Sequence, residues 1–221
     1  MLVTFEGIDG CGKTTQHSLF VEWLESEGAP VIKIKEPGGT PGGEEIRELL
    51  LQYKPPFNER AQMLLFNAAR AQLTQTVILP ALREGSFVVT DRFYDSTLAY
   101  QGYADGQDFS LISKICKYAS WDLEPDITFF LDVPISEALG RIDGRQKDNI
   151  EARGYEYLMK VQEGFLCLCD TFPERIFHIR GSQSIEEIHE TIKHLFIKKA
   201  KREGRWQTWA LLLETRGCVQ P

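Results

Sequence analysis

The sequence predicts one α/β domain with a mainly parallel sheet that carries helices on both faces. Short apolar runs rich in β-branched and aromatic residues alternate with longer stretches of helical periodicity, which is typical of right-handed β-α-β crossovers. The 221 residues contain no internal repeat, no low-complexity stretch and no linker rich in Pro, Gly or Ser. Hydrophobic residues make up 43% and charged residues 26%, which is sufficient apolar content for a full core.

Five apolar runs are the candidate strands of this sheet, in the chain order Leu2–Phe5, Val31–Ile34, Phe87–Thr90, Ile127–Leu131 and Ile176–Ile179. Between and after them, apolar residues recur at helical spacing in four stretches: Leu19–Leu24, Leu64–Ala69, Leu158–Leu168 and Ile185–Leu195. The domain therefore spans about residues 1–200. Residues 201–221 form a C-terminal tail with an expected extra helix around Trp206–Leu213, to which we assign no function.

Charge and composition exclude several classes of protein. Lys and Arg total 25 against 32 Asp and Glu, and the resulting net charge of −7 disfavours a dedicated nucleic-acid binder. No apolar run approaches the roughly 20 residues that cross a bilayer, and the first residues lack the basic start of a signal peptide. The five cysteines have no zinc-like spacing. We expect a soluble, cytoplasmic protein with no structural metal and with neither nucleic acid nor membrane as a partner.

The segment after the first strand has the strongest chemical signal. It reads Gly7-Ile8-Asp9-Gly10-Cys11-Gly12-Lys13-Thr14 and fits the phosphate-loop pattern G-x-x-x-x-G-K-[ST], with a strand before it and an amphipathic helix after it. Its glycines allow backbone N–H groups to point at an anion, and the helix presents its positive end. We expect Lys13 to contact the β and γ phosphates of a nucleotide and the Thr14 hydroxyl to ligate Mg²⁺.

A phosphate loop indicates the nucleotide but leaves three classes of protein open: a GTPase switch, a mechanical ATPase and a kinase for a small acceptor. A GTPase also needs an Asn-Lys-x-Asp guanine reader, and this tetrapeptide does not occur in the chain. Mechanical ATPases are usually larger and have an apolar run that ends in acidic pairs, which is also missing. A small-acceptor kinase is therefore favoured, and a nucleotide-binding regulator stays as the alternative from another class.

Polar segments follow two further strands at the edge where the phosphate loop lies, because parallel strands present their carboxyl ends together. Asp91 offers a carboxylate to Mg²⁺, and Arg92 offers a guanidinium that can bind phosphate oxygens in pairs. Residues Glu36–Gly43 include two prolines and four glycines, which predict a rigid loop rather than a helix and a wall for an acceptor pocket. Phe66 and Arg70 are four residues apart on one helix face, which suits a planar base with carbonyl groups.

Five segments together resemble the bacterial thymidylate kinases: Phe5–Gln16, Glu36–Thr40, Phe66–Arg70, Asp91–Ser96 and Pro125–Pro134. They occur in the family's order over about residues 1–195. The resemblance implies a phosphate-loop nucleoside-monophosphate-kinase fold with a five-stranded parallel core and a short lid. It also implies a homodimer that uses ATP with Mg²⁺ to convert dTMP to dTDP for dTTP biosynthesis. Another nucleoside-monophosphate kinase is the runner-up interpretation.

The resemblance also implies roles around the acceptor. Asp9 resembles the acidic residue near the sugar 3′-hydroxyl and Mg²⁺, and Arg47 and Arg92 resemble the arginines that clamp the acceptor phosphate. Phe66 resembles the ring that stacks on thymine, and Arg70 resembles the donor to thymine O4. The other implied dTMP contacts are Glu36, Pro37, Ser96, Thr97, Gln101 and Tyr100, the last of which crowds the sugar 2′ position.

A basic segment at residues 141–153 is the expected lid. The family has two designs: an arginine in the phosphate loop, or a glycine-rich loop with arginines supplied by the lid. Gly10 occupies the relevant loop position, so this chain resembles the lid-arginine type. The chain departs from the common Asp-Arg-x-Glu pattern with Asp148-Asn-Ile-Glu151. We choose Arg145 as the catalytic lid arginine ahead of Arg153 and Arg141.

On the ATP side, the resemblance places Ser182 and Gln183 against the adenine, in addition to the phosphate-loop residues. The neighbouring Ser184 is explained by structure alone, because a serine followed three residues later by Glu187 is typical of a helix N-terminal capping box.

Overall fold

Five strands form one sheet in the computed structural model, which describes residues 1–144, 148–202 and 204. Their spatial order is β2-β3-β1-β4-β5, and every neighbouring pair is parallel. The bounds are β1 (Leu2–Glu6), β2 (Val31–Lys35), β3 (Phe87–Asp91), β4 (Ile127–Asp132) and β5 (Ile176–Arg180). All five predicted strands are confirmed, and each extends one residue further at its carboxyl end than the sequence indicated.

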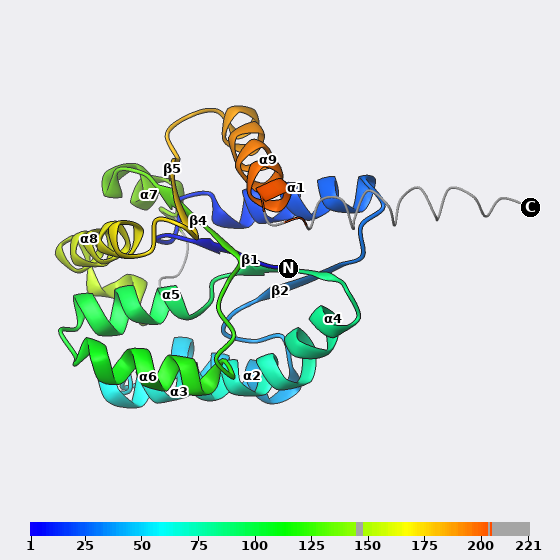
Figure 1. Ribbon diagram of the computed structural model, residues 1–221. Coiled ribbons are helices and arrows are strands. Elements are labelled where there is room, and N and C mark those ends of the chain that lie inside the picture. The colour runs from blue at the N-terminus through cyan, green and yellow to red at the C-terminus, as the bar shows by residue number, and fades with distance from the viewer. Residues whose placement is uncertain (145–147, 203, 205–221) are drawn as a thin grey trace, which may run out of the picture.

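Helices connect the strands and cover both faces of the sheet. Figure 1 shows α1 and α9 on one side, and α2, α3, α5 and α6 on the other. The α-helices are α1 (Lys13–Ser26), α2 (Pro41–Gln52), α3 (Glu59–Leu73), α4 (Leu79–Arg83), α5 (Tyr94–Thr97), α6 (Phe109–Ala119), α7 (Ile135–Arg141), α8 (Tyr155–Thr171) and α9 (Ile185–Arg202). Two π-helical segments, η1 (Thr74–Ile78) and η2 (Leu98–Ala104), and a 3₁₀ turn, η3 (Glu151–Arg153), complete the set. The four predicted helical stretches lie in α1, α3, α8 and α9.

The core forms where the central strands meet α1. Phe5 of β1, Phe20 of α1 and Phe129 of β4 are fully buried, with ring centroids 5.4 to 6.1 Å apart. All residues of β1 and β3 are buried, as expected for strands covered on both faces. Large buried aromatic side chains in contact are a major source of core stability, so the sheet provides a rigid base for the loops at its edge.

The loop predicted for Glu36–Gly43 is wrong at its carboxyl end. The structure places Pro41, Gly42 and Gly43 in the first turn of α2. The Thr40 side chain caps this helix by accepting a hydrogen bond of 3.0 Å from the Gly43 backbone N–H. Proline suits the first helical position because its missing N–H would have no partner there. Capping and proline placement therefore outweigh the poor helix propensity of two glycines.

The carboxyl ends of β1, β2 and β3 converge on one edge of the sheet. Within the register, Lys35 lies beside Asp91, and Asp91 lies beside Phe5. The segments that follow these strands are the phosphate loop, the Glu36–Thr40 turn and the Arg92 region, so three segments far apart in sequence lie together.

The tail helix expected around Trp206–Leu213 lies outside the described residues, and so does Arg145. Among the helices that the structure describes, none combines the length and apolar character required to cross a bilayer.

Candidate functional site

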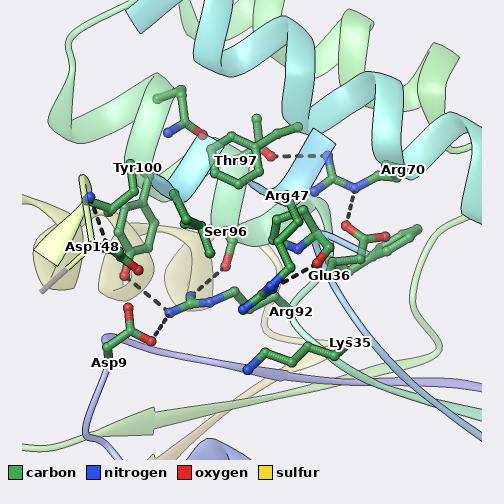
Figure 2. Close-up of a pocket in the computed structure, with 16 residues that line it drawn as sticks. Asp9, Lys35, Glu36, Arg47, Arg70, Arg92, Ser96, Thr97, Tyr100 and Asp148 are labelled. Atoms are coloured by element: carbon green, nitrogen blue, oxygen red, sulfur yellow. Dashed lines mark hydrogen bonds and ion pairs between the residues drawn. The ribbon is translucent and has the colours of Figure 1, made fainter. Parts of the chain in front are cut away.

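Two adjoining cavities open at the carboxyl edge of the sheet. One is lined by the phosphate loop, α1 and the start of α9. The other, of about 660 Å³ including its open mouth, is lined by residues from β2, α2, α3, η2 and the segment before η3. Asp9 and Lys35 line both cavities, so the two spaces meet at these side chains. Figure 2 shows the second cavity, with Asp9 and Lys35 on the side of the phosphate loop.

The phosphate loop has the backbone that its glycines predict. Gly7, Gly10 and Gly12 have φ of 140°, 84° and 98°, in the region that side chains rarely adopt. A Cβ atom at Gly10 would overlap the backbone carbonyl of Ala138 in α7, so this position accepts only glycine in the present arrangement. The Lys13 ammonium donates 2.8 Å to the Ile8 carbonyl and lies 3.6 Å from Asp9 Oδ1. The loop therefore holds its lysine in place at the mouth of the first cavity.

The predicted metal-side residues Thr14 and Asp91 are in contact. The Thr14 hydroxyl donates a 2.8 Å hydrogen bond to Asp91 Oδ2, while the buried Asp91 Oδ1 has no hydrogen-bond partner among the described residues. Burial alone would raise the pKa of Asp91, but the charges of Lys13 and Arg92 outweigh it and hold that pKa below its usual value. An ionised carboxylate with one unused oxygen, beside a hydroxyl, fits a divalent cation or one of its waters.

Arg92 lies at the centre of the second cavity in a left-handed backbone conformation, with φ of 75°. Its guanidinium donates to Asp9 Oδ1 and Ser96 Oγ, each at 2.9 Å (Figure 2). It also donates to the Gly7 carbonyl at 2.9 Å. The same group lies 5.3 Å from the centroid of the Tyr100 ring. These contacts aim a fixed positive charge at the space between the two cavities, where an anionic group would bind.

A buried ion pair forms the far wall of the second cavity. Arg70 Nε donates to Glu36 Oε2 at 2.8 Å, and Arg70 Nη1 donates to Thr97 Oγ1 and Asn67 Oδ1 at 3.1 Å each. Burial is the largest influence on Glu36 and raises the pKa of its carboxyl, against the opposing effect of Arg70. The hydrogen bonds use Arg70 Nε and Nη1, which leaves the Nη2 N–H groups at a buried wall of the cavity, where they suit the carbonyl edge of a base.

The structure brings the other predicted acceptor residues to the same cavity. Arg47 donates 2.8 Å to the Pro37 carbonyl, which places α2 against the Glu36–Thr40 turn. The side chains that line the cavity include Glu36, Pro37, Arg47, Phe66, Arg70, Ser96, Thr97, Tyr100 and Gln101. Every residue that the sequence assigned to the acceptor side therefore lines this one space.

On the opposite side of the phosphate loop, Gln183 lines the first cavity, and Ser182 donates a 3.1 Å hydrogen bond to Glu137 Oε2. The capping box is confirmed: Ser184 Oγ accepts from the Glu187 backbone N–H, and Glu187 Oε2 accepts from the Ser184 N–H. Gln183 thus lies at the cavity above the phosphate loop, whereas Ser182 is held by α7.

The predicted lid arginines have different surroundings. Arg145 lies outside the described residues. Arg153 forms a 2.6 Å ion pair with Asp105 and stacks 3.6 Å above the Tyr157 ring. Arg141 lines the first cavity and pairs with Glu137. Of the two described arginines, only Arg141 faces the space above the phosphate loop.

Asn149 fastens the residues after the undescribed part of the lid to α2. Its side chain donates 3.1 Å hydrogen bonds to the carbonyls of Leu50 and Tyr53 and accepts one of 2.6 Å from Lys54. The neighbouring Asp148 and Ile150 then line the second cavity. The departure from the family's arginine pattern therefore has a structural role, since the asparagine caps the carbonyl end of a helix.

Sequence reasoning missed several residues that line the second cavity: Lys35, Leu51, Phe93, Asp148 and Ile150. Lys35 could have been predicted, because it directly precedes the Glu36 turn and therefore lies at the carboxyl end of a strand, where the site forms. The others carry no local pattern, because they reach the cavity through contacts between distant segments.

The parallel sheet, the phosphate loop and a separate acceptor cavity define a phosphate-loop nucleotide kinase. Known proteins identify the family: the family model described as thymidylate kinase matches residues 5–192. The thymidylate kinase of Kosmotoga olearia is 40% identical over 205 residues, which cover 92% of this chain and 99% of that protein. The thymidylate kinase of Caldanaerobacter subterraneus subsp. tengcongensis is 43% identical over 190 residues, 86% of this chain and 91% of the relative.

Solved structures agree with these relatives. The crystal structure of thymidylate kinase from Ehrlichia chaffeensis superposes with a TM-score of 0.72 at 35% identity, covering 88% of this chain and 98% of that chain. The chain belongs to the thymidylate kinase family.

Proposed function

We propose that this enzyme transfers the γ-phosphoryl group of ATP to dTMP, giving ADP and dTDP for dTTP biosynthesis. The observation that carries this proposal is the meeting of the two cavities at Asp9 and Lys35. One cavity has the phosphate loop that binds a nucleoside triphosphate, and the other combines an aromatic ring, a buried arginine and a second arginine aimed at the junction. Family membership supports the same reaction.

Recognition of the acceptor follows from the residues of the second cavity. The Phe66 ring stacks on the thymine, and Arg70, held by Glu36 and Thr97, donates to thymine O4. Arg47 and Arg92 bind the acceptor phosphate from two sides. Tyr100 packs against Arg92 and excludes a 2′-hydroxyl by crowding the sugar. The contacts of Glu36, Pro37, Ser96, Thr97 and Gln101 complete the proposed dTMP site.

Catalysis in this proposal is charge neutralisation and alignment rather than acid–base chemistry. The acceptor phosphate is largely dianionic at neutral pH, because its second pKa is about 6, so no general base is needed. Two polyanions must approach in line, and Lys13 and Arg92 offset their charge from opposite sides of the junction. Arg145 supplies a further cation from the lid, since Gly10 contributes none.

The proposed metal ion is Mg²⁺, bound with ATP. Thr14 and Asp91 would hold it, because Asp91 Oδ1 has no hydrogen-bond partner in the described part of the chain and Mg²⁺ prefers oxygen ligands. Asp9, where the two cavities meet, would lie near both this ion and the sugar 3′-hydroxyl of dTMP. When bound, the ion neutralises charge on the β and γ phosphates. Within the described residues there is no cluster of three His, Cys, Asp or Glu side chains that could hold a metal ion. Phosphate oxygens and waters would therefore complete the ligands of the ion.

We further propose that the enzyme works as a homodimer in the cytoplasm. Large apolar side chains are exposed on α3, α6 and the turn after α6: Leu64, Leu111, Tyr118 and Trp121. The two helices pack against each other, so these side chains can form one surface for a second copy. Cys11, Cys116, Cys167 and Cys169 are free thiols, which is typical of a reducing compartment.

A coupled assay of ADP release with dTMP, dUMP, dCMP, AMP and GMP tests the proposed reaction. We expect dTMP to give the highest kcat/KM and ADP release to depend on acceptor. A clear preference for another monophosphate would establish the runner-up kinase. ADP release independent of every acceptor would instead indicate a nucleotide-binding regulator.

A further inference from the structure

Glu6, the last residue of β1, is fully buried at the edge of the sheet and lines neither cavity. Burial and then the nearby Asp95 raise the pKa of this carboxyl to about 7, against the effect of Arg92. A buried carboxylate is expensive to keep unless its hydrogen bonds are satisfied. The partners of Glu6 therefore indicate why the chain keeps an acidic group at this position.

The first set of partners belongs to the backbone after Arg92. Glu6 Oε1 accepts from the Phe93 N–H at 2.7 Å and from the Ser96 N–H at 3.3 Å. Phe93 directly follows Arg92, whose left-handed conformation is unfavourable for a residue with a side chain. This contact fixes the chain immediately after the strained residue.

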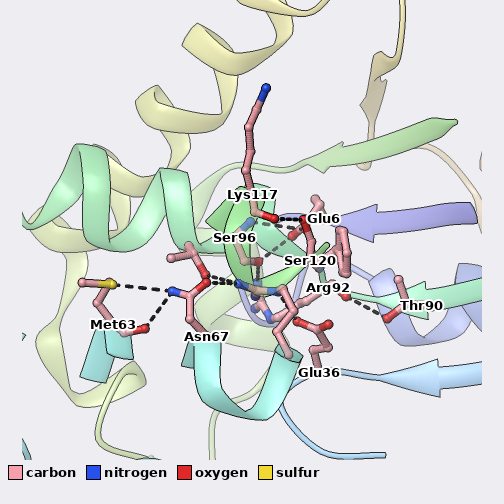
Figure 3. Close-up of polar contacts among 12 residues, drawn as sticks. Glu6, Glu36, Met63, Asn67, Thr90, Arg92, Ser96, Lys117 and Ser120 are labelled. Atoms are coloured by element: carbon pink, nitrogen blue, oxygen red, sulfur yellow. Dashed lines mark hydrogen bonds and ion pairs between the residues drawn. The ribbon is translucent and has the colours of Figure 1, made fainter. Parts of the chain in front are cut away.

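The second partner leads to the guanidinium of Arg92. Glu6 Oε2 accepts a 2.5 Å hydrogen bond from Ser96 Oγ, and Ser96 Oγ accepts a 2.9 Å hydrogen bond from Arg92 Nη1. Because the carboxylate takes the only hydroxyl proton, the serine oxygen presents its lone pairs to the arginine. Figure 3 shows Glu6, Ser96 and Arg92 grouped in this way.

We propose that Glu6 is a positioning residue for the phosphoryl-acceptor site: it fixes Arg92 at the backbone through Phe93 and at the guanidinium through the Ser96 hydroxyl. The inference deepens the proposed function and rests on it, since Arg92 is the arginine assigned to the acceptor phosphate. Glu6 itself touches neither substrate. The guanidinium has four hydrogen-bond partners, Gly7, Asp9, Ser96 and Tyr100. Loss of Glu6 leaves the Ser96 partner without its anchor, so binding of the acceptor must then cover the cost of orienting the guanidinium.

The test is the steady-state kinetics of Glu6→Gln at pH 8, where the wild-type carboxyl is mostly ionised. Glutamine keeps the shape and the oxygen that accepts from Phe93, but the amide nitrogen that replaces Oε2 cannot accept the Ser96 hydroxyl proton. We expect the KM for dTMP to rise about tenfold, with the KM for ATP unchanged and kcat within about threefold of wild type. Ser96→Ala breaks the same link and also removes the proposed contact of Ser96 with dTMP, so the KM for dTMP should rise at least as much as in Glu6→Gln. The double variant should be no worse than Ser96→Ala alone.

Asp95→Asn is the matched control. Asp95 is as fully buried as Glu6 and lies beside Ser96 on α5, but its carboxylate binds Arg175 at 2.6 and 2.8 Å rather than Arg92. This variant should lower the melting temperature while leaving the KM for dTMP close to wild type. A similar rise in that KM in Asp95→Asn would show general loosening of α5 and overturn the proposal.

An unchanged or lower KM for dTMP in Glu6→Gln would also overturn it, as would additive effects in the double variant. If Glu6→Gln does not fold, Ser96→Ala decides, because a normal KM for dTMP there excludes the link through the hydroxyl. Wild-type enzyme without dTMP-dependent ADP release contradicts the proposed function itself, and that outcome is distinct from all of these.

Discussion

The ion pair between Arg70 and Glu36 allows a prediction that joins stability to acceptor recognition. The side chains of Arg70 and Glu36 are only 2% and 4% exposed, so solvent screens their interaction little. Replacing Arg70 with Met removes the 2.8 Å contact to Glu36 and the two 3.1 Å hydrogen bonds to Asn67 and Thr97. Glu36 Oε1 already has no partner among the described residues, so the whole carboxylate would be left without one.

Breaking a buried pair on one side typically costs about 3–5 kcal/mol, because a charge stays buried without compensation. We expect Arg70→Met to lose about this much free energy of unfolding at pH 8. The double variant Glu36→Gln/Arg70→Met removes both charges and should recover most of the loss. Both variants should bind dTMP poorly, so the recovery of stability separates folding from recognition.

The loss should depend on pH with a definite sign. Burial raises the pKa of Glu36 above its usual value, and removal of Arg70 raises it further. A carboxyl whose pKa is higher in the folded state destabilises that state as the pH rises through the folded pKa. The free energy of unfolding of Arg70→Met should therefore fall between pH 5 and pH 8 more steeply than that of wild type.

Urea unfolding followed by circular dichroism at both pH values measures these differences. A loss below about 1 kcal/mol at pH 8, or a loss of equal size at pH 5, would refute the assignment of Arg70 and Glu36 as a strongly coupled buried pair.

The other predictions concern the donor site, the sugar and the lid. Lys13→Ala should lower turnover by several orders of magnitude with unchanged circular dichroism, and activity within about tenfold of wild type would contradict the phosphate-loop assignment. Tyr100→Ala should narrow the preference for dTMP over its ribonucleotide in competition assays, and an unchanged ratio would mean that Tyr100 only fills the core. Arg145→Ala should lower kcat by roughly 10³-fold with near-normal dTMP affinity, and a loss of less than about tenfold would exclude it as the lid cation. Arg153→Ala should mainly lower the melting temperature, because it leaves the Asp105 carboxylate without its ion pair; a selective fall in kcat would instead make Arg153 the catalytic arginine.

The sequence was informative wherever local chemistry decides structure. The β-branched runs became strands, and the glycines of residues 7–14 have the positive φ values that the loop requires. It was misleading at Pro41–Gly43, where a cap and a well-placed proline started a helix despite two glycines. It did not predict the hydrogen bond from the Asn149 side chain to the Leu50 carbonyl, because these residues lie 99 positions apart in sequence. Contacts of that kind depend on the relative placement of whole elements, and no local pattern encodes them.

The close approach of Gly10 to α7 has a consequence for how such enzymes diverge. A side chain at this position would meet the Ala138 carbonyl and would also have to adopt a φ of 84°. Strain of that kind costs about 1–2 kcal/mol before any overlap is counted. On the proposal that the lid supplies the cation, an ancestor of this chain could not have exchanged it for one in the phosphate loop by a single substitution, because α7 would have had to move first. The choice between a lid cation and a phosphate-loop cation is therefore tied to the position of α7. Lineages that differ in this choice are separated by several coupled changes.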